Sequence, residues 1–334
     1  MKISICIPTF NQADYLIQSV RSASNQSLSP FEIIVSNDCS TDNTSRVLQS
    51  LSKDIPQLKV INQPENLGIA GNTDASLRLA TGDLVVRLDS DDYLAPSFCE
   101  KLSSLLKKYP DAGYAHAAVQ EIDQNGHYLK KRWLSRSSGF QPSIDGLKAA
   151  RKGYRVAANI LMFRRSALEK VNFLTDRPNY VEDFHLNASL SATGYGNVYL
   201  HESLSFYRVW IDAEKTRQKR KLMEITGVRR VFQEILEPEY KKRGYNLKGL
   251  HRSKAAIACS NSDCLSWNVY TKKEKIELKK EILKLSSSSK VKFFTWLYMN
   301  GYGGGISLIN KIKGSIKLFA KKLFFPISQL RSIN

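Results

Sequence analysis

The strongest constraint on the fold of this chain is the alternation of short apolar runs with amphipathic segments over its first 95 residues. The runs at 3–7, 31–35, 58–61 and 83–88 have strand length, and the second is rich in β-branched residues. Between them, apolar residues recur at three- and four-residue steps, as in Leu16, Ile17, Val20 and Ala23. Strands that alternate with helices in this way form a mostly parallel sheet with helices on both faces.

The pattern changes after residue 95. We expect a helix over 96–109, a hairpin of 114–122 and 127–131 around a Gln-Asn-Gly turn, a strand over 156–164, a helix over 182–193 and an extended segment over 198–210. The last third is mainly helical by pattern. The sequence therefore predicts an α/β domain over 1–210, with halves 1–95 and 96–210, and a basic helical region over 211–334.

Ligands of parallel sheets bind beyond the carboxyl ends of the strands, so the residues after each run are the candidate site. The fourth run is followed by Asp89-Ser90-Asp91-Asp92. Neighbouring carboxylates repel unless a cation lies between them, and Mg²⁺ and Mn²⁺ prefer oxygen ligands shared with substrate phosphates. The alternative is a turn that caps the helix after Pro96. Asp38 has two readings as well, a contact to a nucleotide base or an Asx-turn before the next helix.

Taken together, these segments resemble the inverting family-2 glycosyltransferases of the GT-A fold. The resemblance covers roughly residues 1–210, and its motifs occur in the family's order. The matching motifs are Ile7-Pro8-Thr9-Phe10-Asn11, Asn37-Asp38-Cys39-Ser40-Thr41-Asp42, Glu65-Asn66-Leu67-Gly68-Ile69-Ala70, Leu88-Asp89-Ser90-Asp91-Asp92, Phe163-Arg164-Arg165-Ser166-Ala167-Leu168 and Glu182-Asp183.

The resemblance implies a role for each matched position. Asp183 would be the general base, with Glu182 beside it, and Asp91 and Asp89 would hold Mn²⁺ or Mg²⁺ at the diphosphate. The residues that would bind the nucleotide sugar are Pro8, Thr9, Asn11, Asp38, Asn66, Gly68, Asp89, Ser90 and Arg208.

The chain departs from the family pattern at several positions. The first acid of the usual Asp-Asp-Gly-Ser run is Asn37, and Trp210 replaces the usual His of Tyr-Arg-x-His. His185 and His201 do not match that His and are interpreted as structural. Acceptor contacts are expected from Trp133, Tyr154, Asn159 or His116, for which ordinary packing is the alternative.

The net charge of +19 is concentrated in the last third. Residues 1–210 hold 23 basic and 21 acidic residues, whereas 211–334 hold 27 basic and 10 acidic ones. Lys313, Lys317 and Lys321 lie on one face of a predicted amphipathic helix, which is typical of segments bound to anionic membranes. We therefore expect a membrane surface, through 282–334, as partner rather than nucleic acid; packing on the catalytic domain is the alternative.

We expect no membrane-spanning helix and no leader, since no apolar run is long enough and Pro8 and Asp14 interrupt the first one. The five scattered cysteines favour a reducing compartment. We predict a metal-dependent inverting hexosyltransferase that moves a sugar from a UDP-linked donor to a glycan or lipid-linked acceptor in bacterial surface polysaccharide synthesis, such as capsule or O-antigen. It would lie at the cytoplasmic face of the membrane. The rivals are a nucleotidyltransferase, whose Gly-rich triphosphate loop is missing, and a non-catalytic membrane- or nucleic-acid-binding module.

Overall fold

The computed structural model describes residues 1–153, 156–174, 180–210 and 218–303. The chain divides into two compact units, Met1–Ser253 and Lys254–Asn334. This division lies later in the chain than the domain boundary predicted after residue 210, because the helical segments Lys221–Arg230 and Val231–Leu236 pack against the helix Glu182–Ala192. Both candidate carboxylate motifs lie in the first unit.

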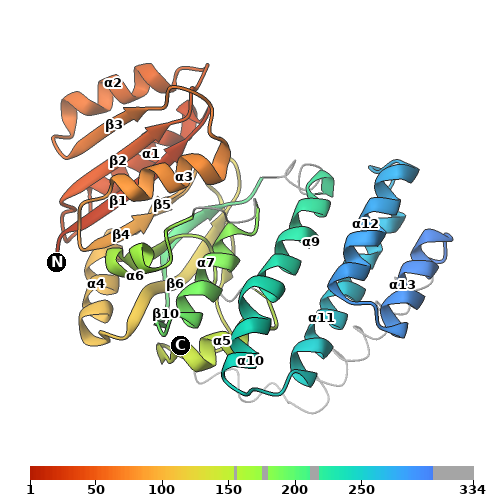
Figure 1. Ribbon diagram of the computed structural model, residues 1–334. Helices are drawn as coiled ribbons and strands as arrows, with labels where there is room; N and C mark the ends of the chain where they lie inside the picture. Colours follow the sequence, from red (N-terminus) through yellow and green to blue (C-terminus); the bar gives the residue numbers. More distant parts are fainter. Residues whose placement is uncertain (154–155, 175–179, 211–217, 304–334) are drawn as a thin grey trace, which may run out of the picture. The chain divides into compact units, whose positions relative to one another are not determined.

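One ten-stranded sheet forms the centre of the first unit, in the order β3-β2-β1-β4-β9-β6-β10-β5 with β7 beside β6 and β8 beside β10 (Figure 1). The strands are β1 (Ile3–Thr9), β2 (Glu32–Asn37), β3 (Leu58–Asn62), β4 (Leu84–Arg87), β5 (Tyr93–Leu94), β6 (Ala112–Ile122), β7 (Tyr128–Arg132), β8 (Gly139–Gln141), β9 (Leu161–Arg164) and β10 (Gly196–Arg208).

The sheet is mostly parallel, as expected. Strands β1 to β4 pair in parallel, and β6 pairs in parallel with β10. Strand β9 runs antiparallel between β4 and β6, and the predicted hairpin is the antiparallel pair β6–β7. The carboxyl ends of β1, β2, β3 and β4 therefore lie at the same edge of the sheet, where the motifs begin.

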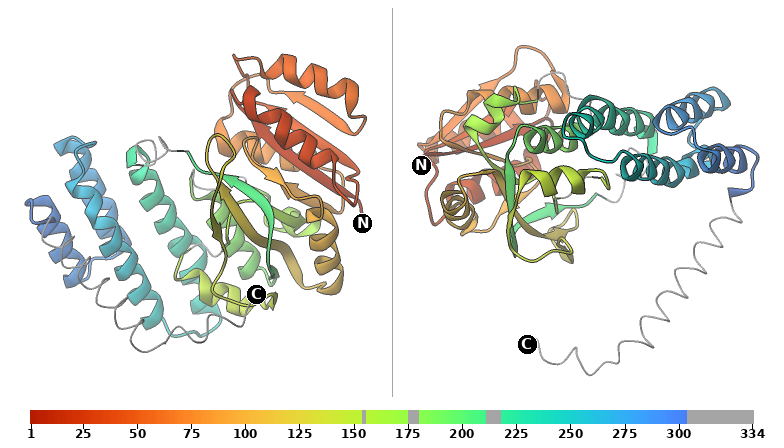
Figure 2. Two further views of the ribbon diagram at one scale, coloured as in Figure 1. Left: turned by 180° about the vertical axis from the view of Figure 1, so that it is seen from behind. Right: turned by 60° about the horizontal axis from the view of Figure 1, so that its bottom comes forward.

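Helices cover both faces of this sheet (Figures 1 and 2). One core packs β-strand residues such as Ile5 and Val86 against α1, α2 and α4, and a second packs Val85 and Leu161 against α3, α6 and α7. The helices are α1 (Ala13–Ser24), α2 (Thr44–Asp54), α3 (Gly68–Leu79), α4 (Phe98–Lys108), α5 (Ser143–Ala150), α6 (Arg165–Lys170) and α7 (Glu182–Ala192).

The last third is helical, as its pattern predicts. The elements are α9 (Lys221–Arg230), the π-helix η1 (Val231–Leu236), α10 (Glu237–Lys242), α11 (Lys248–Asn261), the 3₁₀ helix η2 (Ser262–Ser266), α12 (Lys272–Leu285) and α13 (Ser289–Met299). Among the residues that the structure describes, no helix is both long and apolar enough to span a bilayer. The amphipathic helix predicted from Lys313, Lys317 and Lys321 lies outside the described residues.

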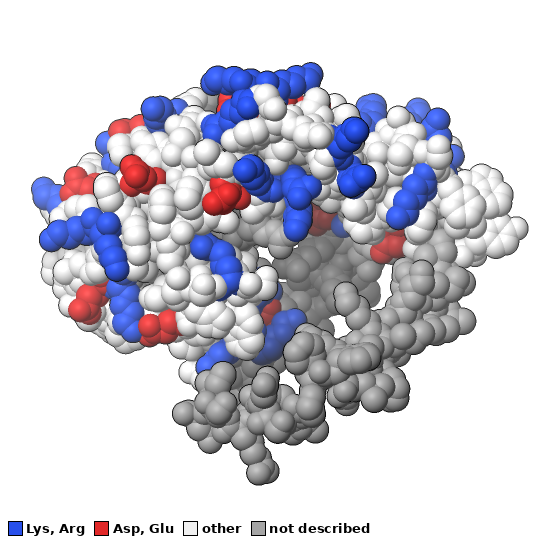
Figure 3. Space-filling view, turned by 90° about the horizontal axis from the view of Figure 1, so that it is seen from below, with Lys and Arg blue, Asp and Glu red and all other residues white. Residues whose placement is uncertain are grey.

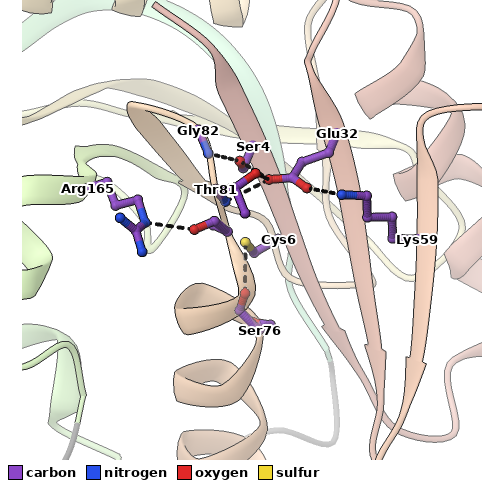
Figure 4. Close-up of polar contacts among 9 residues, drawn as sticks. Ser4, Cys6, Glu32, Lys59, Ser76, Thr81, Gly82 and Arg165 are labelled. Carbon is purple, nitrogen blue, oxygen red and sulfur yellow. Dashed lines mark hydrogen bonds and ion pairs between the residues drawn. The ribbon is translucent and has the colours of Figure 1, made fainter.

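A buried carboxylate ties the strands together at the opposite edge of the sheet (Figure 4). Glu32 accepts hydrogen bonds from Ser4 Oγ at 2.6 Å, Lys59 Nζ at 2.7 Å and the Thr81 backbone N–H at 2.7 Å. The backbone of Gly82 passes so close that an added Cβ would lie 2.7 Å from Ser4 Oγ. These bonds hold the pKa of Glu32 at about 2 against the opposing effect of burial.

Replacing Glu32 by Gln is expected to lower the free energy of unfolding by about 2 kcal/mol, because hydrogen bonds to a buried charge are lost. Since the folded-state pKa of Glu32 is depressed from 4.5 to about 2, this stabilisation is present above pH 4.5 and lost as pH falls toward 2. Urea denaturation at pH 7 and at pH 3 measures both effects. Glu100→Gln, at an exposed position, is the matched control, and an equal effect of both variants would contradict the prediction.

Candidate active site

Asp38 is buried just after β2, and its carboxylate binds the start of α3. Its two oxygens accept the backbone N–H groups of Leu67 at 2.7 Å and Gly68 at 3.0 Å. The Asp38 N–H in turn donates to the Thr9 carbonyl oxygen at 2.9 Å. Asp38 thus caps the start of α3, whereas the Asx-turn interpretation expected it to cap the next helix along the chain. The contact to a nucleotide base stays a prediction.

The loop between β3 and α3 is shaped by Asn66 and Gly68. Asn66 Oδ1 accepts the Gly68 N–H at 3.1 Å, and Asn66 Nδ2 donates to the Asp38 carbonyl oxygen at 3.2 Å. Gly68 has a φ of +71°, a conformation that other L-residues adopt at a cost. The motif residues Asn66 and Gly68 therefore set the backbone that meets Asp38.

The end of β1 forms the neighbouring wall. Thr9 is buried, and its Oγ1 has no hydrogen-bond partner among the described residues. Asn11 has a φ of 52°, and its Oδ1 accepts the Thr41 N–H at 2.8 Å, which joins the Pro8–Asn11 segment to the loop after β2. A buried hydroxyl without a partner at this edge is available to a ligand.

The three carboxylates after β4 have different surroundings. Asp89 has 30% of its side chain exposed and accepts a hydrogen bond from Arg87 Nε at 3.2 Å. Asp91 Oδ2 accepts the indole N–H of Trp210 at 2.7 Å. Asp92 is buried and accepts the Arg208 backbone N–H at 2.7 Å, a contact to the end of β10 rather than to the helix after Pro96. Ser90, between them, is also buried.

Asp89 and Asp91 suit a hard divalent cation. Burial, and then the charge of Asp89, raise the pKa of Asp91, which shows that the negative charges of these two carboxylates act on each other. Because Trp210 occupies Oδ2 of Asp91, Oδ1 is the oxygen left for a cation. Two carboxylates plus substrate phosphate oxygens are a common ligand set for Mg²⁺. Within the described ranges, no cluster of three or more His, Cys, Asp and Glu side chains forms a metal centre of its own.

Arg208 lies in the acidic site but binds protein groups. Its guanidinium donates to the carbonyl oxygens of Asp91, Asp123 and Gln124 at 2.8–3.1 Å and to Gln18 Oε1 at 3.0 Å. It also stacks 4.5 Å from the centroid of the Tyr15 ring. These contacts fix the loop that carries Asp91. The contact of Arg208 with a diphosphate, implied by the family resemblance, stays a prediction.

Glu182 and Asp183 form the first turn of α7, where the helix dipole also favours acids. Asp183 is paired through Oδ1 with Arg87 Nη1. Burial raises its pKa to about 7, Arg87 opposes the rise, and Glu182 adds to it. Glu182 Oε2 is buried and has no hydrogen-bond partner among the described residues. A carboxylate with a pKa near neutrality is suited to accept a proton.

A cavity of about 120 Å³ lies beside this helix start. It lies between the first turn of α3 and Glu182 of the acid pair. The residues that line it are Leu67, Gly68, Ile69, Ala70, Tyr180 and Glu182. Tertiary structure thus brings three of the predicted motifs, Asp38 with its loop, Asp89–Asp92 and Glu182–Asp183, to one region.

The proposed acceptor residues have mixed surroundings. His116 is buried between Tyr114 and Tyr199, and burial lowers its pKa to about 3, so packing is the better interpretation. Trp133 is 54% exposed and lies against His201, and Asn159 is half-buried. Tyr154 lies outside the described residues. His185 bonds Glu234 at 2.9 Å, which fits the structural role expected of it.

Sequence reasoning missed Arg87 and the bond from Trp210 to Asp91. The only signal for Arg87 was a charged residue inside an apolar strand, directly before the acidic motif. Trp210 was noted only as a departure from the family pattern. Its bond to Asp91 joins residues 119 positions apart, which no local pattern predicts.

Comparison with known proteins gives consistent results. The model of glycosyl transferase family 2 matches residues 4–171. GalNAc(5)-diNAcBac-PP-undecaprenol beta-1,3-glucosyltransferase of Campylobacter jejuni is 33% identical over 216 residues, which are 63% of this chain and 65% of that protein. Chondroitin synthase of Escherichia coli is 32% identical over 127 residues, 38% of this chain and 18% of that protein. The chain spans less than two thirds of the length of these relatives.

Solved structures share the fold. S. aureus TarS 1-349 in complex with UDP has a TM-score of 0.57 at 16% identity, covering 91% of this chain and 92% of that one. Mannosyltransferase PcManGT from Pyrobaculum calidifontis, in complex with GDP-Man and Mn²⁺, has a TM-score of 0.55 at 17% identity, covering 91% and 86%. At these identities the likeness concerns the fold alone.

Proposed function

Because the chain belongs to glycosyl transferase family 2, we propose that it moves a hexose from a UDP-linked donor to a hydroxyl of a glycan or lipid-linked acceptor. The predicted α/β fold of GT-A type and the predicted enzyme class are confirmed by the family and the fold. The nucleotidyltransferase and the non-catalytic module are set aside. The observation that supports the proposal is the pairing of Asp183 with Arg87, which brings the Asp183 carboxylate beside the acids that follow β4.

The residues divide the chemistry between them. Asp183 takes the proton of the acceptor hydroxyl as its oxygen attacks the anomeric carbon, the bond from that carbon to the diphosphate oxygen breaks, and the anomeric configuration inverts. Mn²⁺ or Mg²⁺ held by Asp89 and Asp91 would supply Lewis-acid stabilisation of charge on the leaving diphosphate. Thr9, Asn11 and the Asp38 loop would bind the nucleotide, with Pro8, Asn66, Gly68, Ser90 and Arg208 supporting it.

A panel of UDP-N-acetylglucosamine, UDP-glucose and GDP-mannose tests the function. In the absence of acceptor, water takes the acceptor's place, and release of nucleoside diphosphate reports slow hydrolysis. We expect a UDP-sugar to be hydrolysed faster than GDP-mannose in the presence of Mn²⁺. No turnover with any nucleotide sugar, by protein that binds UDP, would contradict the proposed reaction.

The acceptor class is proposed from the relatives. One of them is named for a pyrophosphate-linked undecaprenol acceptor and another for synthesis of chondroitin, a polysaccharide. A lipid-linked acceptor lies at a membrane surface, and the basic region 282–334 fits a protein bound there from the cytoplasmic side, in capsule or O-antigen synthesis. Lys and Arg predominate over Asp and Glu on the face drawn in Figure 3. We propose that transferase chemistry resides in residues 1–210 and membrane binding in the helical remainder.

Replacing Lys313, Lys317 and Lys321 together by Glu is expected to reduce binding to phosphatidylglycerol vesicles at least ~100-fold, since each Lys near an anionic surface contributes about 1 kcal/mol. Vesicle co-sedimentation of the full chain measures it. The matched control is the triple replacement of Lys53, Lys107 and Lys108 by Glu, which makes the same change of charge in the first unit. Equal loss in both variants would indicate a general charge effect, and no loss would refute the membrane role.

A further inference from the structure

Arg87 is a buried cation inside the acidic site, and no matched motif includes it. It is the last residue of β4, and only 5% of its side chain is exposed. The other residues of β4, Leu84, Val85 and Val86, are apolar and buried, so packing alone does not explain an arginine in this strand. A buried guanidinium is costly unless carboxylates or carbonyls compensate its charge, so its partners explain its presence.

Those partners come from two separate motifs. Arg87 Nε donates to Asp89 Oδ1 at 3.2 Å, and Arg87 Nη1 donates to Oδ1 of Asp183, which lies 96 positions further along the chain. Strand geometry accounts for the reach. Alternate residues point to the same face, and Val85 belongs to the core that packs under α7. Arg87 therefore leaves the sheet on the side of α7 and meets its first turn.

We propose that Arg87 is a positioning residue, which holds the Asp183 carboxylate by one oxygen and fixes it against the donor-site carboxylate of Asp89. The proposal rests on the proposed function, since it assigns Arg87 a task only if Asp183 is the base. With Oδ1 held by Arg87, Oδ2 is the oxygen that meets the acceptor hydroxyl. The guanidinium suits this task because its planar donors point in fixed directions and it stays protonated.

The charges that face Asp183 support this role. Arg87 is the cation that lowers the pKa of Asp183, whereas burial, Glu182 and Asp89 raise it, with a net value of about 7. Helix η1 packs on α7 and carries Glu234. This carboxylate accepts a hydrogen bond from Arg230 and is paired with His185, so it already has partners of its own. Without Arg87, Asp183 would keep its proton to higher pH.

The test compares Arg87→Met with wild type by three measurements. Calorimetric binding of UDP with Mn²⁺ should change by less than ~3-fold. Turnover of UDP-N-acetylglucosamine, or of whichever panel sugar the wild type hydrolyses fastest, should fall ~100-fold or more. The acid limb of its pH profile should move up by about one pH unit or more. The control is Arg165→Met, which removes a half-buried arginine that donates to the Ala80 carbonyl oxygen. It should change neither the turnover nor the acid limb of the pH profile.

The variants separate the two ideas. Asp183→Asn with wild-type turnover would refute the base, and with it the proposed function. Loss in Asp183→Asn, but unchanged turnover and acid limb in folded Arg87→Met, would overturn the inference alone. Parallel loss of UDP binding would also overturn it, because Arg87 would then serve the donor. If Arg87→Met does not fold, Arg87→Lys decides: we expect ~10-fold lower turnover, and wild-type turnover would overturn the proposal.

Discussion

Asp183→Asn is expected to lower sugar transfer ~1,000-fold while binding of UDP with Mn²⁺ stays within ~3-fold of wild type. Asparagine has the same shape but cannot take the acceptor's proton, and general base catalysis contributes roughly 10²–10⁴-fold. Release of UDP from the donor measures transfer or hydrolysis, and calorimetry measures UDP binding. Unchanged turnover would remove Asp183 as the base.

The pH dependence gives the same prediction a second readout. The folded-state pKa of Asp183 is raised to about 7, so the base is protonated and inactive below that pH. Wild-type turnover should rise as pH increases through about 7, and residual turnover of Asp183→Asn should lack this rise. Asp145→Asn, an exposed first-turn acid of α5, should change neither rate nor profile. If Asp145→Asn does change the rate or the pH profile, the loss in Asp183→Asn would reflect removal of a first-turn acid from a helix dipole rather than removal of a base.

Asp91→Asn is expected to lower turnover ~100-fold, because the variant can still accept the Trp210 N–H but loses the charge that binds a cation. A loss of about 3 kcal/mol of transition-state stabilisation corresponds to this factor. Removal of divalent ions from wild type with EDTA should give a comparable loss, and Mn²⁺ should restore it. UDP release in the two conditions is the measurement.

Two results would contradict a metal role for Asp91. One is turnover that is indifferent to EDTA, and the other is wild-type turnover in Asp91→Asn. Asp111→Asn, at an exposed acid before β6, is the matched control for a change of one charge in the same domain. It should keep wild-type turnover and the wild-type response to EDTA.

Much of the fold could be predicted because its signals are local. Strand runs and helical spacing each extend over a few residues, so β1, α4 and α7 lie close to their predicted ranges. The strand predicted over 156–164 is shorter, covering Leu161–Arg164. β-Branched and apolar content alone does not tell a strand from the irregular segment that leads into it.

The candidate site, like the fold, was predictable from the sequence only where the signal is local. The residue types at the strand ends predicted where a nucleotide sugar and a cation would bind, because parallel strands bring their carboxyl ends to one edge. The same sequence left Asp38 and Asp92 open between binding and capping. The structure adds their hydrogen-bond partners, Leu67 and the Arg208 backbone, which come from other elements, and the binding roles stay predictions.

By itself the sequence determined the alternation of strands and helices over its first 95 residues, the acidic motifs after the strand runs, and the excess of charge in the last third. Only the tertiary structure decided that Arg87 joins Asp89 to Asp183 and that Trp210 holds Asp91. The reason is physical. Periodicity records which face of an element is buried, whereas a buried charge is stabilised by whichever partners the packing of distant elements brings within hydrogen-bond distance.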